Sequence, residues 1–350
     1  MKNLCILVIL VLFVASCRSD RKPAAEAGAA TVYPVAGSIE RLDPALDAII
    51  PPGARLEILG EGYAWSEGPV WVESHGFLLF SDIPPNKVYK WSESEGVTLY
   101  LHPSGYTGPT GRGGEGGANG LLIDPQGRLV LCQHGDRRMA YMNAPLDAPA
   151  TEYVTIADSY ESRRFNSPND AAYRSNGELY FTDPPYGLEK GEDDPLKEIP
   201  FQGVYRIMTD GTVELLTSEL SRPNGIGFSP DEKTLYVANS DPQKALWMAY
   251  EVLDDGRLGQ GRVFYDATSL VATEKGLPDG FAVDAHGNIF ATGPGGVWVF
   301  HPDGRALGLI RTGQATANCT FGNEGTVLYI TAHMYLMRLV LVPSKIAGIL

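Results

Sequence analysis

A short apolar run that follows a glycine or a charged turn recurs six times along this 350-residue chain. The runs are spaced by 51, 50, 56, 54 and 39 positions and are anchored on Leu78, Leu129, Leu179, Leu235, Ile289 and Leu328. Units of about fifty residues, each able to hold four short strands, are typical of β-propeller blades. The 40 glycines and 25 prolines supply the many turns that such a chain needs. We therefore predict an all-β protein folded as a six-bladed β-propeller.

The sixth unit shows only weak signs of an outermost strand of its own. An unassigned strand candidate, Arg55-Leu56-Glu57-Ile58-Leu59, lies ahead of the first unit. Joining this segment to the last blade would close the ring and remove an open sheet edge, which otherwise invites aggregation. We expect one propeller domain over residues 55–350, closed by this N-terminal strand.

The N-terminus has the pattern of an export signal. A short basic start precedes an apolar run from Leu4 to Val14, and Val14-Ala15-Ser16-Cys17 resembles a bacterial lipoprotein box. We predict a signal peptide over residues 1–17, with Cys17 as the lipidation site; an ordinary signal peptide is the alternative. Residues 18–54 are expected to form a tether and N-terminal extension. The chain would then be an exported, membrane-anchored lipoprotein, periplasmic or at the cell surface, that meets the membrane only through its lipid.

The net charge argues against one class of partner, and the positions of the cysteines argue against a disulfide. The formal net charge is -14 and there is no basic run, so nucleic acid is not expected as a partner. Cys132 and Cys319 both lie in strand-like apolar segments, which favours buried thiols over a disulfide. We expect a monomer that acts on a small molecule.

A second periodic feature lies ten or eleven residues before each anchor. All six positions hold Glu, Asn or Asp, and they are Glu67, Asn119, Asn169, Asn224, Asp279 and Asn318. The first strand of each propeller blade lines the central channel, so these side chains are predicted to form a ring around the axis. Any one Asx-Gly pair could simply mark a turn. Turns do not explain six matched offsets or the glutamate.

Carboxylate and amide oxygens that converge on one axis suit a hard cation. Ca²⁺ takes six to eight oxygen ligands, and no Cys/His cluster with zinc spacing is present. We predict Ca²⁺, with another divalent metal as the alternative. The residues just past the anchors, among them Asp82, His134, Asp183 and Asn239, should return to the same end of the channel.

Several motifs resemble those of the SMP-30/gluconolactonase/LRE-like family, whose members include calcium-binding six-bladed propellers and gluconolactonases. The motifs occur in order from about Leu56 to the C-terminus, as Ser-Glu-Gly-Pro-Val-Trp (66–71), Asn119-Gly120-Leu121, Ser-Pro-Asn-Asp (167–170), Thr-Asp-Pro-Pro-Tyr-Gly (182–187), Arg-Pro-Asn-Gly (222–225) and Leu-Pro-Asp-Gly (277–280). Because their order and spacing are kept, the resemblance is specific.

The resemblance implies roles for individual residues. Glu67, Asn224 and Asp279 match metal-ligand positions, and Asn169 matches a position that contacts metal or substrate. Arg164 matches a substrate-contacting arginine. With Asn119, His134 and Asp183, it completes the predicted substrate-binding set. The Gly-rich stretch 105–117 and the Pro-rich stretch 184–200 are interpreted as covers beside the site, although the second could be a solvated insertion.

These residues lead to the hypothesis of a metal-dependent hydrolase that opens a sugar lactone. The metal would polarise the carbonyl and orient a water molecule, and Asp279 would be the base. A non-catalytic propeller that binds a sugar or a partner is the alternative outside enzymes. Hydrolysis of another ester or of a phosphotriester is the alternative within them.

Overall fold

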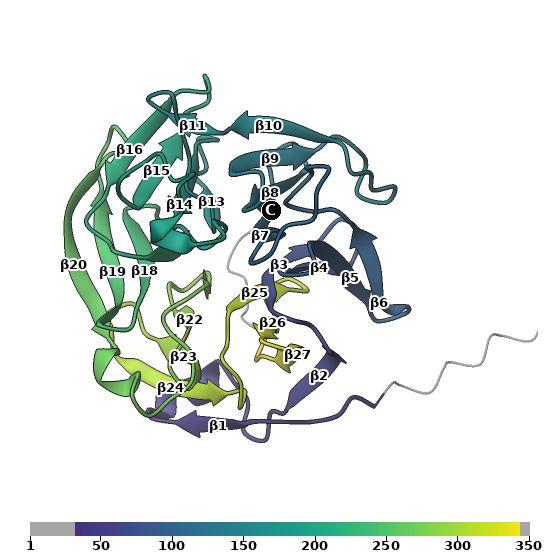
Figure 1. Ribbon diagram of the computed structural model, residues 1–350. Coiled ribbons are helices and arrows are strands. Elements are labelled where there is room, and N and C mark those ends of the chain that lie inside the picture. The colour runs from purple at the N-terminus through teal and green to yellow at the C-terminus, as the bar shows by residue number, and fades with distance from the viewer. Residues whose placement is uncertain (1–31, 344–350) are drawn as a thin grey trace, which may run out of the picture. The chain divides into compact units, whose positions relative to one another are not determined.

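The computed structural model describes residues 32–343, and within that range it contains β-strands and three short 3-10 helices but no α-helix. Six sheets of four or five antiparallel strands surround a central axis, along which Figure 1 looks. A two-stranded hairpin lies between the second and third sheets in the sequence. The prediction of a six-bladed β-propeller is confirmed.

The blades follow one another along the chain, and each begins with its innermost strand. The first two comprise β3 (Ser66–Val72), β4 (Phe77–Asp82), β5 (Lys87–Ser92) and β6 (Gly96–Leu101), then β7 (Ala118–Ile123), β8 (Leu129–Gln133), β9 (Arg138–Met142) and β10 (Tyr153–Ala157). The hairpin of β11 (Ser159–Tyr160) and β12 (Arg163–Arg164) precedes the third blade, which comprises β13 (Ala171–Tyr173), β14 (Leu179–Asp183), β15 (Gly203–Ile207) and β16 (Val213–Thr217). The fourth comprises β17 (Pro223–Phe228), β18 (Thr234–Asp241), β19 (Lys244–Val252) and β20 (Leu258–Asp266).

The last two blades each recruit a strand from the N-terminal part of the chain. The fifth comprises β21 (Phe281–Val283), β22 (Ile289–Gly293), β23 (Gly296–Phe300) and β24 (Ala306–Arg311), with β1 (Ser38–Arg41) on its outer edge. The sixth comprises β25 (Asn318–Gly322), β26 (Val327–Ala332) and β27 (Tyr335–Val340), and its fourth strand is β2 (Leu56–Glu61). In that pairing Leu56 lies opposite Leu339 and Ile58 lies opposite Met337.

The six anchors of the repeat all lie on the second strand of a blade, where they are buried on both faces of the sheet. Their side chains are at most 2 % exposed. Apolar side chains of neighbouring blades pack together between the sheets, as where Cys132 of β8 lies in one cluster with Phe181 of β14 and Tyr205 of β15. Cys132 and Cys319 are both buried free thiols, as predicted. Burial of these faces is what holds the blades in a fixed ring.

The N-terminal extension is bound to the propeller over the residues that the structure describes. The Ala36 N–H donates to the Leu56 carbonyl (3.1 Å), and the 3-10 helix η1 (Pro44–Ala48) buries Leu46 completely against the fifth blade. The residues from Tyr33 to Gly37 therefore lie along the propeller. The predicted signal peptide and Cys17 fall outside the described residues. Within residues 32–343, no helix is long and apolar enough to cross a membrane.

Candidate metal and substrate site

The predicted ring of polar residues lies around the axis at one end of the propeller. Four of its members belong to the innermost strands β3, β7, β17 and β25, and the other two lie just before β13 and β21. Five of the six line one cavity of about 420 Å³, namely Glu67, Asn119, Asn169, Asn224 and Asp279. The repeat thus brings side chains from five blades to one place.

The glycines in the ring motifs allow the innermost strands to approach one another. A Cβ atom on Gly225 would lie 2.4 Å from the Asp279 carbonyl oxygen of the next blade, and one on Gly68 would lie 2.0 Å from the Asn119 carbonyl oxygen. These distances are too short for any side chain. Gly225 also has no positive φ, so its Asn-Gly pair serves close packing and not a left-handed turn.

Hydroxyl groups of the second strands hold the ring backbone in place. Ser81 Oγ donates to the Asn119 carbonyl (2.8 Å), and Thr182 Oγ1 donates to the Asn224 carbonyl (2.7 Å). Both hydrogen bonds run from one blade to the next and are buried. Because Asn119 and Asn224 are each fixed by a neighbouring blade, their side chains are positioned before any ligand arrives.

Glu67 and Asp279 form a buried pair of carboxylates on this axis. Burial raises the pKa of Glu67 to about 8, although Glu67 Oε2 accepts a hydrogen bond from the Gly68 N–H at 2.9 Å. Burial, and then the charge of Glu67, raises the pKa of Asp279 well above its ordinary value. Asp279 Oδ1 is buried and has no hydrogen-bond partner within the described residues. Two such carboxylates call for a positive charge between them.

The side-chain amides of Asn169 and Asn224 can also offer oxygen atoms to a positively charged ligand. Asn224 Nδ2 donates to Ser240 Oγ (3.0 Å), and Asn169 Nδ2 lies 3.5 Å from His134 Nε2. Since both NH₂ groups face protein atoms, the Oδ1 atoms remain for a ligand. Burial first, and then the charge of Arg112, lowers the pKa of His134 to about 3, so this ring is neutral and can accept the hydrogen.

These residues fit a hard divalent cation. Among residues 32–343 no group of three or more His, Cys, Asp and Glu side chains is arranged to hold a metal ion by itself, so amide oxygens of the ring would have to share the role with its carboxylates. Glu67 and Asp279 would supply the charge, and Asn169 and Asn224 would supply neutral oxygens. Oxygen donors of this kind are those that Ca²⁺ prefers in proteins.

Asn318 differs from the other ring members and does not line the cavity. Its Oδ1 accepts a hydrogen bond from the Cys319 N–H (2.8 Å), and its side-chain dipole partly offsets the burial that raises the pKa of Glu67 and of Asp170. Asp170 and Asn318 instead line a separate pocket of about 270 Å³ between the innermost strands. Asn318 therefore supports Glu67 and has no free oxygen for a cation.

Three residues predicted to bind substrate lie outside the cavity lining, namely His134, Arg164 and Asp183. Asp183 is fully buried and accepts hydrogen bonds from the N–H groups of Asn166 (2.8 Å) and Ser167 (2.7 Å). Arg164 is exposed and donates to the Asp136 carbonyl (2.6 Å). His134 is buried directly behind Asn169. Of the predicted substrate contacts, only Asn119 and Asn169 face the cavity itself.

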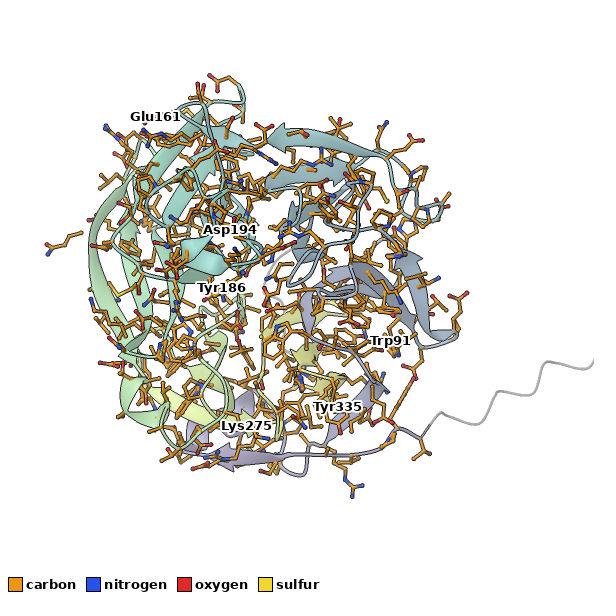
Figure 2. The ribbon with its side chains drawn as sticks, viewed as in Figure 1. Trp91, Glu161, Tyr186, Asp194, Lys275 and Tyr335 are labelled. Carbon is orange, nitrogen blue, oxygen red and sulfur yellow. The ribbon has the colours of Figure 1, made fainter. Side chains whose placement is uncertain are left out.

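The structure also adds cavity residues that the sequence reasoning missed. Glu115 comes from the Gly-rich cover and Tyr186 from the Pro-rich cover, and Trp65 and Ser240 complete the wall beside the ring. Tyr186 lies near the centre of the ring in Figure 2. The covers were recognised from composition, but no periodicity marks which of their residues point inward.

Comparison with known proteins shows which family the chain resembles. The model of the SMP-30/gluconolactonase/LRE-like region matches residues 65–334. The chain belongs to this family. It is 40 % identical over 309 residues to a gluconolactonase of Zymomonas mobilis, covering 86 % of this chain and 85 % of that one.

Solved structures of the family have the same fold. A gluconolactonase of Xanthomonas campestris superposes with a TM-score of 0.74 at 33 % identity, covering 88 % of this chain and 97 % of its own. A calcium-binding regucalcin of Agrobacterium tumefaciens superposes with a TM-score of 0.64 at 20 % identity, covering 91 % and 98 %. The latter likeness concerns the fold alone. The family match contains all six ring residues, so the cavity lies wholly within the shared region.

Proposed function

We propose that this protein is a gluconolactonase-like enzyme that hydrolyses a sugar lactone with the help of a divalent cation, Ca²⁺ being the preferred candidate. The observation that carries the proposal is the buried pair of Glu67 and Asp279, with an unpartnered Asp279 Oδ1, at the base of a cavity of about 420 Å³. The 40 % identity to a gluconolactonase supports the same reaction class.

The cation would be held by Glu67, Asn169, Asn224 and Asp279. When bound, it would supply positive charge that stabilises the negative charge developing on the lactone carbonyl oxygen. The chain's own contribution is to hold these four side chains rigidly. Ser240 fixes the Asn224 amide and His134 fixes the Asn169 amide, so neither has to reorient when substrate enters.

Asp279 is proposed as the base that takes a proton from the attacking water. Its Oδ1 has no competing hydrogen bond in the described part of the chain, so it can accept one from a water molecule in the cavity. The proton passes to the carboxylate while the water oxygen bonds to the carbonyl carbon. The ring C–O bond then breaks, and the proton that was taken up neutralises the alkoxide that leaves.

The test is a substrate panel with the purified protein in buffer free of divalent ions. We expect opening of glucono-δ-lactone above the spontaneous rate when Ca²⁺ is added, loss of that activity with EDTA, and little turnover of aryl esters or phosphotriesters. Turnover that is unaffected by chelation would contradict the cation's role. Saturable binding of sugars without turnover of any ester would favour a non-catalytic propeller.

Export and lipidation are proposed from the N-terminal sequence. Cys17 follows an apolar segment with small residues before it, which is the pattern of lipoprotein processing. In a bacterial host, the wild-type chain should incorporate labelled fatty acid and pellet with membranes, whereas Cys17→Ala should do neither. Equal labelling of the two chains would contradict this proposal.

A further inference from the structure

We infer that Glu115 binds substrate hydroxyl groups and thereby selects polyhydroxylated lactones over bare ones. This inference rests on the proposed lactonase function. It concerns the cover that forms one wall of the cavity, and no metal ligand is involved.

The first observation is where Glu115 lies. It belongs to the Gly-rich cover, yet it lines the same cavity as Glu67 and Asp279. Its charge acts on both of those carboxylates, so the three lie in one electrostatic environment. A substrate held against the ring would therefore meet the Glu115 side chain.

The second observation is that the Glu115 carboxyl is unused. Within residues 32–343 it makes no side-chain hydrogen bond, and its Oε2 lies 3.6 Å from His134 Nδ1, beyond hydrogen-bond distance. His134 Nδ1 is itself buried without a hydrogen-bond partner. The Glu115 side chain keeps 38 % of its surface exposed, so its oxygens remain accessible from the cavity.

The third observation is that the cover holding Glu115 is fastened to the propeller. Asn86 Oδ1 accepts hydrogen bonds from the N–H groups of Gly105 (2.7 Å) and Tyr106 (3.2 Å). Arg112 donates to the Gly135 carbonyl (3.0 Å) and to the Gly187 carbonyl, and thus ties the Gly-rich cover to the Pro-rich one. Glu115 is therefore held at a fixed place on the wall.

An unused, positioned carboxyl group suits hydroxyl recognition. Its oxygens can accept hydrogen bonds from one or two hydroxyl groups of a sugar, and the half-buried faces of Trp65 and Tyr186 line the same cavity. A substrate that lacks those hydroxyls would leave the carboxyl desolvated and unpaired. Sites built in this way discriminate strongly against the analogue that lacks the polar group.

The experiment compares two lactones with the same six-membered ring, glucono-δ-lactone and δ-valerolactone, which has no hydroxyl groups. For Glu115→Ala, we expect kcat/KM on glucono-δ-lactone to fall by roughly tenfold or more, mainly through KM, as for the loss of hydrogen bonds to a charged group. On δ-valerolactone, kcat/KM should change by less than about threefold. Glu115→Gln, which keeps one acceptor oxygen, should give an intermediate loss. All rates are corrected for spontaneous opening.

The control is Glu189→Gln. Glu189 is an exposed acidic residue on the other cover, 3.7 Å from Arg112, and it does not line the cavity. If the effect of Glu115→Ala came only from the loss of a negative charge near Arg112, Glu189→Gln would reproduce that effect. We expect Glu189→Gln to leave the preference for glucono-δ-lactone over δ-valerolactone unchanged.

Two results would overturn the inference. One is that Glu115→Ala lowers kcat/KM equally on both lactones, or lowers it on neither. The other is a fall in Ca²⁺ affinity as large as that of Glu67→Gln, which would make Glu115 a metal ligand. Failure of the lactonase proposal is separate, because the wild-type protein would then open neither lactone above the spontaneous rate.

Discussion

The propeller carries two sets of Asp, Glu and Asn side chains, each at equivalent positions of its blades. One set leaves side-chain oxygens available to a ligand, and the other hydrogen-bonds to the protein backbone. One set is the axial ring, where Asp279 Oδ1 has no partner within the described residues. The other set follows the second strands. There Asp82 accepts from the N–H groups of Ala64 and Trp65 (both 3.0 Å), and Asp183 accepts from two others.

Residue type therefore does not decide the role of these side chains. In the second set, each carboxylate accepts hydrogen bonds from two backbone N–H groups of the turn that leads into the innermost strand, and it thereby holds that turn. In the ring, the neighbouring blade satisfies the backbone, and the side-chain oxygens are left over. The proposed ligand-binding role of the ring depends on the second set and the inter-blade hydroxyls, which fix the backbone around it.

The largest expected effect is on the ring. Asp279→Asn should lower kcat/KM on glucono-δ-lactone by about a thousandfold or more, because it removes both the proposed base and a charged cation ligand. The same variant should be at least as stable as wild type without metal, since it relieves the repulsion with Glu67. Steady-state kinetics and thermal unfolding, each with Ca²⁺ and with EDTA, measure the two effects.

An active Asp279→Asn enzyme would contradict the assignment of the base. Loss of activity accompanied by loss of the folded state would instead place Asp279 with the structural set. The comparison therefore depends on measuring both quantities in the same variant.

The next largest effect concerns the second set. Asp183→Asn should lower the free energy of unfolding by about 3 kcal/mol, because an amide replaces one of two buried acceptors by a donor that faces an N–H group. Ca²⁺ affinity of the folded protein should change little. Denaturant unfolding and calorimetric Ca²⁺ titration provide the test, with Asp210→Asn, in an exposed turn, as the matched control.

If Asp183→Asn kept full stability but lost substrate affinity, Asp183 would have the substrate-binding role that the family resemblance implied. Its burial and its two backbone partners argue for the structural role.

Much of this organisation could be predicted from the sequence because it is periodic. The anchors mark second strands since those strands are buried on both faces. The offset of ten or eleven residues places Glu67 on an innermost strand and Asp279 just before one. Strands that lie outside the repeat could not be predicted in this way. Strand β1, Ser-Ile-Glu-Arg, is short and polar, and only its pairing with β24 makes it a strand.

The finer roles within the site depend on partners that no spacing encodes. Asn318 has the right offset, but its oxygen accepts the Cys319 N–H. Glu115 has no repeat equivalent, and it reaches the cavity because the cover is folded back over the ring. In both cases the deciding contact is tertiary.

Without metal, the stability of the protein should depend on pH because several carboxyl groups are buried in and beside the ring. In the metal-free protein, burial raises the pKa of Glu67 to about 8 and those of Asp170 and Glu115 to about 7, all above the values of unfolded carboxyls. The folded state then holds more protons than the unfolded state between about pH 4.5 and pH 8. Its free energy of unfolding should fall across that window, by several kcal/mol between pH 5 and pH 8.

Denaturant unfolding of protein dialysed free of divalent ions, at pH 5, 6, 7 and 8, measures this fall. Saturating Ca²⁺ should abolish or reverse the trend because the cation takes the place of the protons. Metal-free protein that grows more stable toward pH 8 would mean that the ring carboxylates are already compensated by other groups.

The smallest effect tests how the ring is supported. Ser240→Ala removes the hydroxyl that accepts from Asn224 Nδ2 and donates to the Pro278 carbonyl, and it leaves all four proposed ligands in place. Freed to rotate, the Asn224 amide should hold the cation less well, and Ca²⁺ affinity should fall by about tenfold. Calorimetric titration measures this fall, with Ser229→Ala, in an exposed hairpin of the same blade, as the control. If affinity stayed unchanged while Asn224→Ala abolished binding, the amide would be oriented by the cation itself. The amide would then be positioned by its ligand and not prepared by the hydroxyl of the adjacent strand.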